Sequence, residues 1–473
     1  MAKITIEINN NKCKVSGNMK VLMRLEKAFA IKNPNAFFMR RSMPTGWDGK
    51  MHYITDRGYF KTGFLENVCN WLIEDGNKIK FDDQRMPLCK PKIPKKIGNL
   101  VPRPYQIDAI KANVLHEVAG IPHRVTVTDA ATNAGKTLIM AGIWLAFRKK
   151  HNAIVLLNDG DLFEQFKTEI PELVGEENFG YVRGKEHKWN KFTICMVQSV
   201  SRNLKYMQRE LAKFEIALID EADLGDNKTY KSVLNYLFNT SVRNGLSGTI
   251  YMSKLKKHEM GNENLRAFFG NVAFKITKKE MVKKGHSTNL IIKIIRGSTI
   301  PGIKGDFKAE YDKCITFNKE RHLVSAQRTE FNAKRDRLPA IVICQFHKHI
   351  ENLYNYYQEY FGDRYIIKAV HGATPDRKEI LADFKVGKID ILICSFIIRR
   401  GKNFPLLQYM QNAASSDSNS TVSQLMGRME RKHESKTKSY IEDLYDEGFY
   451  LNRHSKHRIN YYKKEGFKVI KKI

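Results

Sequence analysis

The chain has 473 residues, which is too many for one hydrophobic core and enough for two or three domains. An apolar content of 42% excludes a disordered chain. The formal net charge of +31 excludes an ordinary near-neutral surface and predicts a polyanionic partner, with nucleic acid as the first candidate.

Other features of the composition point to a cytoplasmic protein without a membrane partner. The 7 cysteines are dispersed and form no CxxC pair, which favours reduced thiols over a disulfide framework or a zinc site. The longest apolar stretch, residues 138–147, is too short to cross a bilayer, and the N-terminus lacks the apolar block of a signal peptide. The alternatives to nucleic acid are a charge that only keeps the protein soluble and a set of acidic protein partners.

Residues 1–95 are expected to form a small α/β domain that contributes to DNA binding. Strand-like and helix-like periodicity alternates there, and basic and aromatic side chains surround Trp47. Such a mixture is typical of a nucleic-acid contact, although a core tryptophan with a solvated basic rim would look the same. The basic, proline-bearing residues 90–96 are typical of a linker.

Two α/β blocks and a basic tail follow. Strands and helices alternate through residues 100–280 and again through residues 285–445, which predicts two parallel sheets with crossover helices. Residues 446–473 are strongly basic and are expected to form a helical tail.

Residues 130–137 predict a phosphate-binding loop for ATP. In such loops backbone N–H groups and a helix N-terminus surround the phosphates, the lysine neutralises charge, and the threonine hydroxyl ligates Mg²⁺. Ala130 stands where a first glycine is usual, and the loop can still form if the φ of Ala130 is negative. A Gly-Lys turn at an ordinary helix start is the alternative. The expected ATP-binding residues are Ala130, Ala131, Thr132, Asn133, Ala134, Gly135, Lys136 and Thr137.

Asp220 and Glu221 follow the strand-like residues 216–219 and are expected to be the acidic pair of an ATPase. A carboxylate at the end of a buried strand can hold Mg²⁺ through its water shell, and a neighbouring glutamate can orient and deprotonate the attacking water. We therefore expect Thr137 and Asp220 to serve the metal and Glu221 to act as the base. An acidic turn after a strand is the alternative for this motif alone.

Gln424, Arg428 and Arg431 are spaced by four and three residues, so they share one face of a helix. Two arginines on such a face can neutralise the charge that develops on the γ-phosphate, an effect of roughly 10³–10⁵ in rate in some phosphoryl-transfer systems. The alternative is a basic, solvated helix. Both arginines are counted here as candidate catalytic residues.

Further polar residues are candidates for adenine, DNA or coupling contacts. Gln106 follows Pro104 and is expected to hydrogen-bond adenine, although an ordinary helix start is the alternative. Hydroxyls and amides that follow strands can contact a phosphate backbone, and the Ser-Gly-Thr at 247–249 can link the ATP state to the grip on nucleic acid. The residues expected in these DNA and coupling roles are Gln198, Ser199, Ser247, Thr249, Ser395 and Gln424.

The ordered motifs from Arg103 to Arg431 resemble those of superfamily 2 helicases. The literal Asp-Glu-Ala-Asp suggests the DEAD-box RNA helicases, but those carry Ser-Ala-Thr and His-Arg-Ile-Gly-Arg where this chain has Ser-Gly-Thr and Gln-Leu-Met-Gly-Arg. The chain looks most like the tailed-phage UvsW-type branch-migration helicases, and Asn403 departs from the Asp of many relatives. The matching segments are Arg-Pro-Tyr-Gln (103–106), Ala-Gly-Lys-Thr (134–137), Asp-Glu-Ala-Asp (220–223), Ile-Cys-Gln-Phe (343–346), Val-His-Gly-Ala-Thr (370–374), Gly-Lys-Asn-Phe-Pro (401–405) and the Gln-x-x-Gly-Arg-x-x-Arg that starts at Gln424.

This resemblance implies two tandem RecA-like domains, preceded by the small α/β domain, with ATP and Mg²⁺ in the cleft between them and Gly401 at the ATP site. It also implies an ATP-dependent DNA helicase that remodels forks, Holliday junctions and R-loops in recombination and repair. The expected partners are single-stranded and branched duplex DNA, with RNA in R-loops. A monomer in the cytoplasm of a phage-infected host cell is expected. Two alternatives stay open, namely a DEAD-box RNA helicase and a DNA-binding protein with a weak or vestigial ATP switch.

Overall fold

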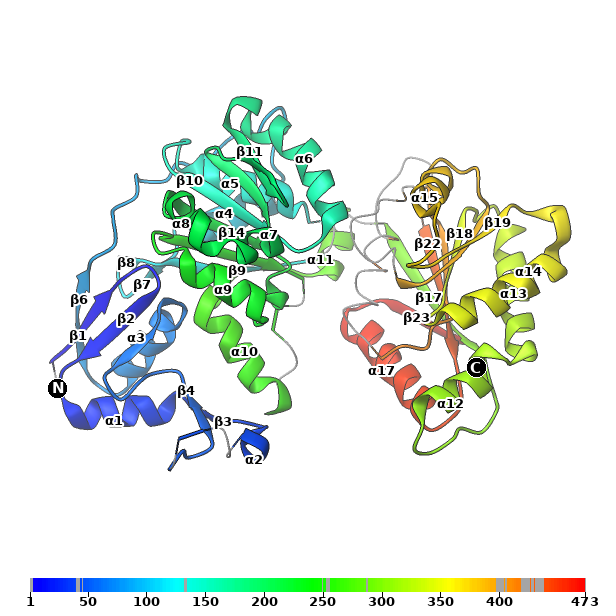
Figure 1. Ribbon diagram of the computed structural model, residues 1–473, viewed down its shortest axis with the longest axis horizontal. Coiled ribbons are helices and arrows are strands. Elements are labelled where there is room, and N and C mark those ends of the chain that lie inside the picture. Colours follow the sequence, from blue (N-terminus) through cyan, green and yellow to red (C-terminus); the bar gives the residue numbers. More distant parts are fainter. Residues whose placement is uncertain are drawn as a thin grey trace. The chain divides into compact units, whose positions relative to one another are not determined.

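The chain forms two compact units, with residues 1–130 and 134–276 in the first and 277–473 in the second. Figure 1 shows that each unit is built on β-sheets with helices packed against them. No helix in the part of the chain that is described is long and apolar enough to span a membrane. The computed structural model describes residues 3–39, 43–44, 46–131, 134–248, 250–251, 256–285, 288–396, 404, 406–417, 426, 429 and 438–472.

The first unit begins with a small domain on a four-stranded sheet. Its strand order is β5-β2-β1-β6, with β1 antiparallel to β2 and parallel to β6. Alternate residues Ile4, Ile6 and Ile8 of β1 are fully buried, because they pack with residues of α1 and α3 in one apolar cluster. The elements are β1 (Lys3–Ile8), β2 (Lys12–Ser16), α1 (Met19–Ala28), β3 (Ala30–Lys32), α2 (Ala36–Met39), β4 (Lys50–His52), β5 (Tyr59–Lys61), α3 (Leu65–Glu74) and β6 (Lys78–Asp83).

The larger part of the first unit is an eight-stranded sheet in the order β12-β11-β13-β10-β14-β15-β9-β16, and every pair except β11–β12 is parallel. Buried residues alternate along β14, so Leu218 joins the cluster under α4, α5 and α6, and Ile219 joins the cluster under α8, α9 and α10. The helices are α4 (Pro104–Val114), α5 (Lys136–Ala146), α6 (Gly160–Val174), α7 (Val197–Arg202), α8 (Leu204–Leu211), α9 (Lys228–Tyr236) and α10 (Lys256–Phe269). The strands are β9 (Arg124–Ala130), β10 (Asn152–Leu157), β11 (Phe179–Arg183), β12 (Glu186–Lys188), β13 (Phe192–Met196), β14 (Phe214–Asp220), β15 (Val242–Ser247) and β16 (Val272–Ile276), with a short hairpin of β7 (Glu117–Val118) and β8 (Ile121–Pro122).

Polar contacts join the small domain to the large sheet of the same unit. The Tyr53 hydroxyl donates to Asn264 Oδ1 at 2.8 Å in α10. The fully buried guanidinium of Arg243 in β15 donates to Asn11 Oδ1 in the turn between β1 and β2. Ala267 of α10 lies in the apolar cluster of the small domain. The small domain and the first large sheet therefore share a core and form one body, although the composition of residues 90–96 predicts a linker between them.

The second unit is a seven-stranded parallel sheet in the order β19-β20-β18-β21-β22-β17-β23. Residues of α15 and α17 pack in the cluster on one face of this sheet, and residues of α13 and α14 pack on the other. The strands are β17 (Asn289–Arg296), β18 (Ala340–Ile343), β19 (Ile367–Val370), β20 (Ile391–Cys394), β21 (Tyr409–Asn412), β22 (Lys438–Tyr445) and β23 (Lys468–Lys472). The helices are α11 (Lys278–Lys283), α12 (Phe307–Tyr311), α13 (Lys319–Ala333), α14 (His347–Phe361), α15 (Arg377–Lys385) and α17 (Tyr450–Lys464).

The C-terminal residues 446–473, expected to form a helical tail, contain a helix and also a strand of this second sheet. The expected helix is α17, but β23 pairs in parallel with β17 over five residues and so adds an edge strand. Glu310, which is fully buried, ties down the start of α17, because its carboxylate accepts four backbone N–H groups. The donors are Ile303, Phe449, Tyr450 and Leu451, at 2.9–3.0 Å.

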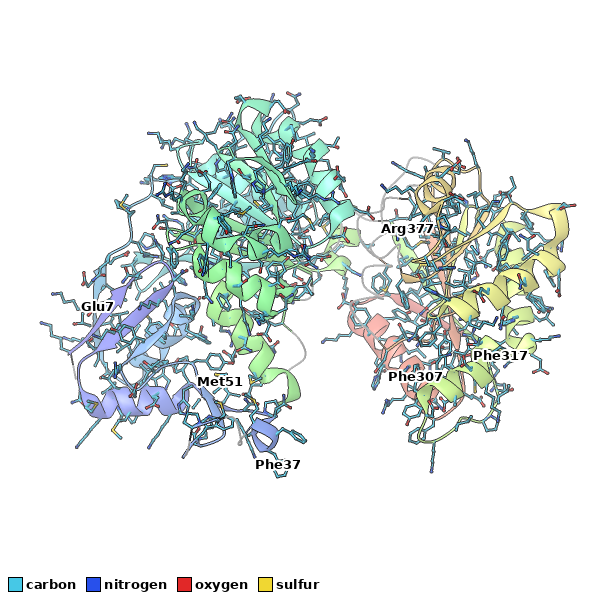
Figure 2. All side chains as sticks on the ribbon, in the orientation of Figure 1. Glu7, Phe37, Met51, Phe307, Phe317 and Arg377 are labelled. Carbon is cyan, nitrogen blue, oxygen red and sulfur yellow. The ribbon has the colours of Figure 1, made fainter. Side chains whose placement is uncertain are left out.

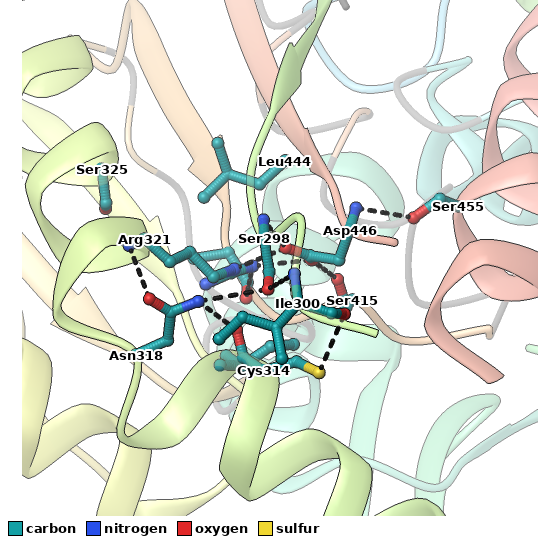
Figure 3. Close-up of polar contacts among 12 residues, drawn as sticks. Ser298, Ile300, Cys314, Asn318, Arg321, Ser325, Ser415, Leu444, Asp446 and Ser455 are labelled. Atoms are coloured by element: carbon teal, nitrogen blue, oxygen red, sulfur yellow. Dashed lines mark hydrogen bonds and ion pairs between the residues drawn. The ribbon is translucent and has the colours of Figure 1, made fainter. Parts of the chain in front are cut away.

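Buried ion pairs hold the helices of the second unit onto β22 and the residue that follows it. Arg321 of α13 pairs with Asp446 at 2.7 Å with both side chains fully buried, in a network that also takes in Ser415 and Ser298 (Figure 3). Removing one partner of such a pair leaves an uncompensated buried charge and typically costs about 3–5 kcal/mol. Arg458 of α17 forms a second buried pair with Asp443, and the partly buried Arg328 of α13 pairs with the fully buried Glu442.

Candidate nucleotide-binding site

The predicted phosphate loop lies between β9 and α5. Gly135 is the N-cap of α5 with φ +72° and ψ +47°, in the left-handed region that favours glycine. A Cβ on this residue would lie less than 3.0 Å from Nε2 of Gln106, so the backbone favours glycine and a larger residue would require the Gln106 amide to move. Lys136 and Thr137 then form the first turn of the helix. The free N–H groups of such a turn favour an anion.

Ala130, which replaces the usual first glycine, is the last residue of β9. It is fully buried and is not among the residues with positive φ, so its Cβ meets no backbone strain. Ala131 and Ala134 are buried as well. Thr132 and Asn133 lie outside the described residues, and their roles stay predictions.

The side chain of Gln106, in α4, forms a hydrogen bond with the predicted phosphate loop. Its Oε1 accepts the backbone N–H of Arg103 at 2.9 Å at the start of α4, and its Nε2 donates to the Ala134 carbonyl at 3.0 Å. The Tyr105 hydroxyl donates to the same carbonyl at 3.1 Å. Gln106 is 5% exposed, so the amide expected to contact adenine already bridges the helix start and the phosphate loop. Contact with adenine stays a prediction.

Lys136 faces the acidic pair at the end of β14. Its Nζ lies 3.5 Å from Oδ1 of Asp220, which is 5% exposed. Burial alone would lower the pKa of Lys136, but the nearby carboxylates of Asp220, Glu221 and Asp223 outweigh burial and raise it. The ammonium therefore stays charged, as a group that neutralises phosphate must.

Glu221 adopts a backbone conformation that is unusual for a residue with a side chain. Its φ of +51° and ψ of +48° lie in the left-handed region, which costs a non-glycine residue about 1–2 kcal/mol. Such strain persists where the surrounding structure enforces it, and it is common at functional sites. Here it lies between β14, which is paired with a strand on each side, and a 3₁₀ turn at Ala222–Leu224, directly beside Asp220.

Ser247 connects the Ser-Gly-Thr segment at 247–249 to the acidic segment at 220–223. It ends β15, the strand next to β14, and its hydroxyl donates to Asp223 Oδ1 at 2.8 Å. Asp223 is the last residue of the Asp-Glu-Ala-Asp segment, and the sequence pattern assigned it no role of its own. Thr249, the other residue expected in this role, lies outside the described residues.

The residues expected to contact DNA lie near the carboxyl ends of strands, and two of them are engaged within the protein. Gln198, just after β13, donates to Asn158 Oδ1 at 2.7 Å, and Asn158 follows β10. The Ser199 hydroxyl accepts the backbone N–H of Gly184 at 2.8 Å. Ser395 follows β20 and is half-buried. A polar residue directly after a buried strand was the signal that could have identified Asn158.

The remaining predicted residues lie outside the part of the chain that the structure describes. These residues are Gly401, Gln424, Arg428 and Arg431. Their expected contributions to ATP binding, coupling and transition-state charge stay predictions. Among the described residues no group of three or more His, Cys, Asp or Glu could hold a metal ion.

Comparisons with known proteins match both units. A family model described as Type III restriction enzyme, res subunit, matches residues 99–252, and one described as Helicase conserved C-terminal domain matches residues 321–433. The ATP-dependent DNA helicase UvsW of Enterobacteria phage T4 is 22% identical over 472 residues, covering 90% of each chain. Its crystal structure covers 99% of each chain at 19% identity with a TM-score of 0.46.

Two other solved structures share the fold. Dbp5 of S. cerevisiae, in a structure with RNA and ADP BeF3, has a TM-score of 0.53 at 15% identity over 78% of this chain and 90% of its own. The Lhr helicase of Mycobacterium smegmatis, bound to ssDNA and AMP-PNP, has a TM-score of 0.53 at 14% identity over 78% of this chain and 49% of its own. The expected pair of RecA-like α/β domains is thereby confirmed. The chain carries the two domains of a superfamily 2 helicase and is related, at low sequence identity, to UvsW of phage T4.

Proposed function

We propose that this protein is an ATP-dependent DNA helicase or translocase that remodels branched DNA, namely forks, Holliday junctions and R-loops. The observation that carries the proposal is the arrangement around Lys136, where a left-handed Gly135 starts α5 and Asp220 lies 3.5 Å from the lysine ammonium. The choice of DNA is supported by the likeness to UvsW over most of both chains, and the net charge of +31 suits either nucleic acid.

The residues present fit Mg²⁺ and ATP. The N-terminus of α5 and Lys136 would hold the phosphates, Thr137 and Asp220 would serve the metal, and ATP supplies the free energy of its hydrolysis. Glu221 is proposed to accept a proton from the attacking water, since it directly follows Asp220. Arg428 and Arg431 are proposed to neutralise the charge that develops on the γ-phosphate.

The main test is the ATPase activity of the purified full chain with and without DNA. Lys136→Ala is expected to abolish DNA-stimulated turnover while DNA binding persists, because the lysine serves phosphate and not DNA. Glu221→Gln is expected to bind ATP and not hydrolyse it. Lys111→Ala, which removes an exposed lysine from α4, is the matched control and should keep wild-type turnover. Unchanged turnover in Lys136→Ala would refute the assignment.

The substrate is tested by unwinding assays on a four-way junction, a fork, an R-loop and a blunt duplex, each with and without ATP. ATP-dependent remodelling of the branched substrates, with little action on the blunt duplex, is the expected result. Stimulation of the ATPase by RNA alone would instead support an RNA helicase. We further propose that the protein works as a monomer in the cytoplasm of a phage-infected host cell, on the strength of its likeness to the phage T4 protein.

A further inference from the structure

In the part of the chain that the structure describes, helices pack on one face of the four-stranded sheet of the small domain. Residues Ile4, Ile6 and Ile8 of β1 point into the core with α1 and α3, so the alternating Thr5 and Glu7 point to the opposite face. Figure 2 shows Glu7 projecting away from the helices of this domain. We call this opposite side of β5-β2-β1-β6 the open face.

The open face is rich in lysine. The strand register brings Lys3 beside Lys78, and it pairs Lys14 with Tyr59 on one side and Glu7 on the other. Among the described residues, no ion pair involves any of these lysines. Two carboxylates, Glu7 and Asp82, lie side by side, so six lysines against two acids leave an excess of four positive charges. The lysines of the open face are Lys3, Lys12, Lys14, Lys61, Lys78 and Lys80.

Two of these lysines lie beside the ring of Tyr59. The ammonium groups of Lys12 and Lys14 lie 5.2 Å and 5.4 Å from the centre of the Tyr59 ring, which is 37% exposed. Burial, followed by the positive charges of Arg243 and Lys12, lowers the pKa of the adjoining Lys61. The two ammonium groups beside the Tyr59 ring would attract an anion.

We propose that the open face binds the phosphate backbone of a duplex arm of the DNA substrate, without reading its sequence. The proposal rests on the proposed DNA helicase function and adds a second contact surface to it. Residues two apart on one strand of a sheet are about 6.7 Å apart, a spacing close to that of successive phosphates along a DNA strand. Lys12 and Lys14 have this spacing on β2, so they can engage neighbouring phosphates.

A duplex suits this surface better than a single strand. Surfaces that bind single strands combine a basic groove with exposed rings on which bases stack. The open face has one aromatic residue, Tyr59, and two ammonium groups already lie within 5.4 Å of the centre of its ring. Its lysines are spread over all four strands of the sheet, which suits contacts with the outside of a double helix.

The test compares wild type with the double variant Lys12→Gln/Lys14→Gln in the full chain. Equilibrium binding to a 20-base-pair blunt duplex and to a single strand of the same length is measured by fluorescence anisotropy at several salt concentrations, without ATP. Two lost phosphate contacts should reduce the slope of log K against log salt by about 1.8 for the duplex. Between 50 and 200 mM salt the wild type would then lose about 12-fold more duplex affinity than the variant. The single-strand slope should stay the same.

A matched control removes the same charge from the helical side of this domain. Lys20→Gln/Lys27→Gln changes two exposed lysines of α1 and should leave both slopes at wild-type values. An unchanged duplex slope in the Lys12/Lys14 variant, or an equal loss in the α1 control or on the single strand, would overturn the proposal. Because binding is measured without ATP, it is read separately from the ATPase test of the proposed function.

Discussion

The close approach of the Gln106 side chain to Gly135 gives a quantitative prediction for the variant Gly135→Ala. Gly135→Ala should destabilise the first unit in two ways. A left-handed backbone costs an alanine about 1–2 kcal/mol. The new Cβ also has to displace the Gln106 amide, which lies less than 3.0 Å from it. That amide makes two hydrogen bonds, to Arg103 and Ala134, each contributing about 1 kcal/mol. The expected loss for Gly135→Ala is about 3–4 kcal/mol in the free energy of unfolding.

The double variant separates these two causes. Gln106→Ala alone should cost about 2 kcal/mol, since it removes the same two hydrogen bonds. In the Gly135→Ala/Gln106→Ala chain these bonds can be lost only once, so the expected total is again about 3–4 kcal/mol. Simple addition of the single variants would give about 5–6 kcal/mol, so the expected coupling is about 2 kcal/mol.

Urea denaturation followed by tryptophan fluorescence measures this loss in the correct unit, because every tryptophan of the chain lies there. Gly120→Ala is the control, since Gly120 also has a positive φ, of +83°, but a Cβ there meets nothing within 4 Å. It should show the backbone cost alone and no coupling to Gln106→Ala. Additivity of Gly135→Ala and Gln106→Ala within about 0.5 kcal/mol would refute the clash as the source of the loss. The four tryptophans are Trp47, Trp71, Trp144 and Trp189.

Three further predictions concern buried polar groups. Glu310→Gln leaves backbone N–H groups at the start of α17 without an acceptor, so it should lower the unfolding free energy of the second unit by roughly 3–5 kcal/mol. Circular dichroism should detect this loss and tryptophan fluorescence should not, because the tryptophans lie in the first unit. Asn11→Ala removes a partner of the buried Arg243 guanidinium and should cost the first unit about 1–3 kcal/mol in urea denaturation; an unchanged midpoint would contradict this. Burial, then Arg321, lowers the pKa of His322 to about 4, and burial likewise lowers that of His123 to about 3. An unfolded histidine binds a proton below about pH 6.5, whereas the buried histidine does not. The free energy of unfolding should therefore be highest above about pH 6.5 and should fall toward about pH 4, by roughly 3 kcal/mol for His322. Urea midpoints that stay constant from pH 7 to pH 5 would contradict that sign.

Local sequence patterns predicted the strands and the helix that flank the candidate site of the first unit. The strand that ends at Ala130 and the helix that begins at Lys136 follow from an apolar run, a Gly-Lys pair and a second apolar run, each of which acts over a few residues. The same holds for the strand that ends at Asp220. The attachment of Gln106 to Ala134 joins residues 28 apart, and no local pattern predicts such a pairing.

The second unit was harder to predict because its central strands carry buried charge. β22 contains Glu442 and Asp443 in its interior, and these residues disrupt the apolar alternation by which a strand is recognised. They are tolerated because Arg328 and Arg458 pair with them, and Arg458 belongs to the helix that the sequence presents as a basic tail. The pairing of β23 with β17 depends on how that helix packs, so it cannot be predicted from a local sequence pattern either.

One strand connects the small domain to the acidic motif of the ATP site. β15 carries Arg243, which donates to Asn11 of the small domain, and it ends at Ser247, which donates to Asp223. It is hydrogen-bonded on both sides, by β14 and β9, and such a strand has little freedom to bend between its ends. The open face and the phosphate loop therefore belong to one body. DNA held on that face would move with the loop whenever the first unit moves, so the small domain is suited to carry a duplex arm along with the ATP-binding domain.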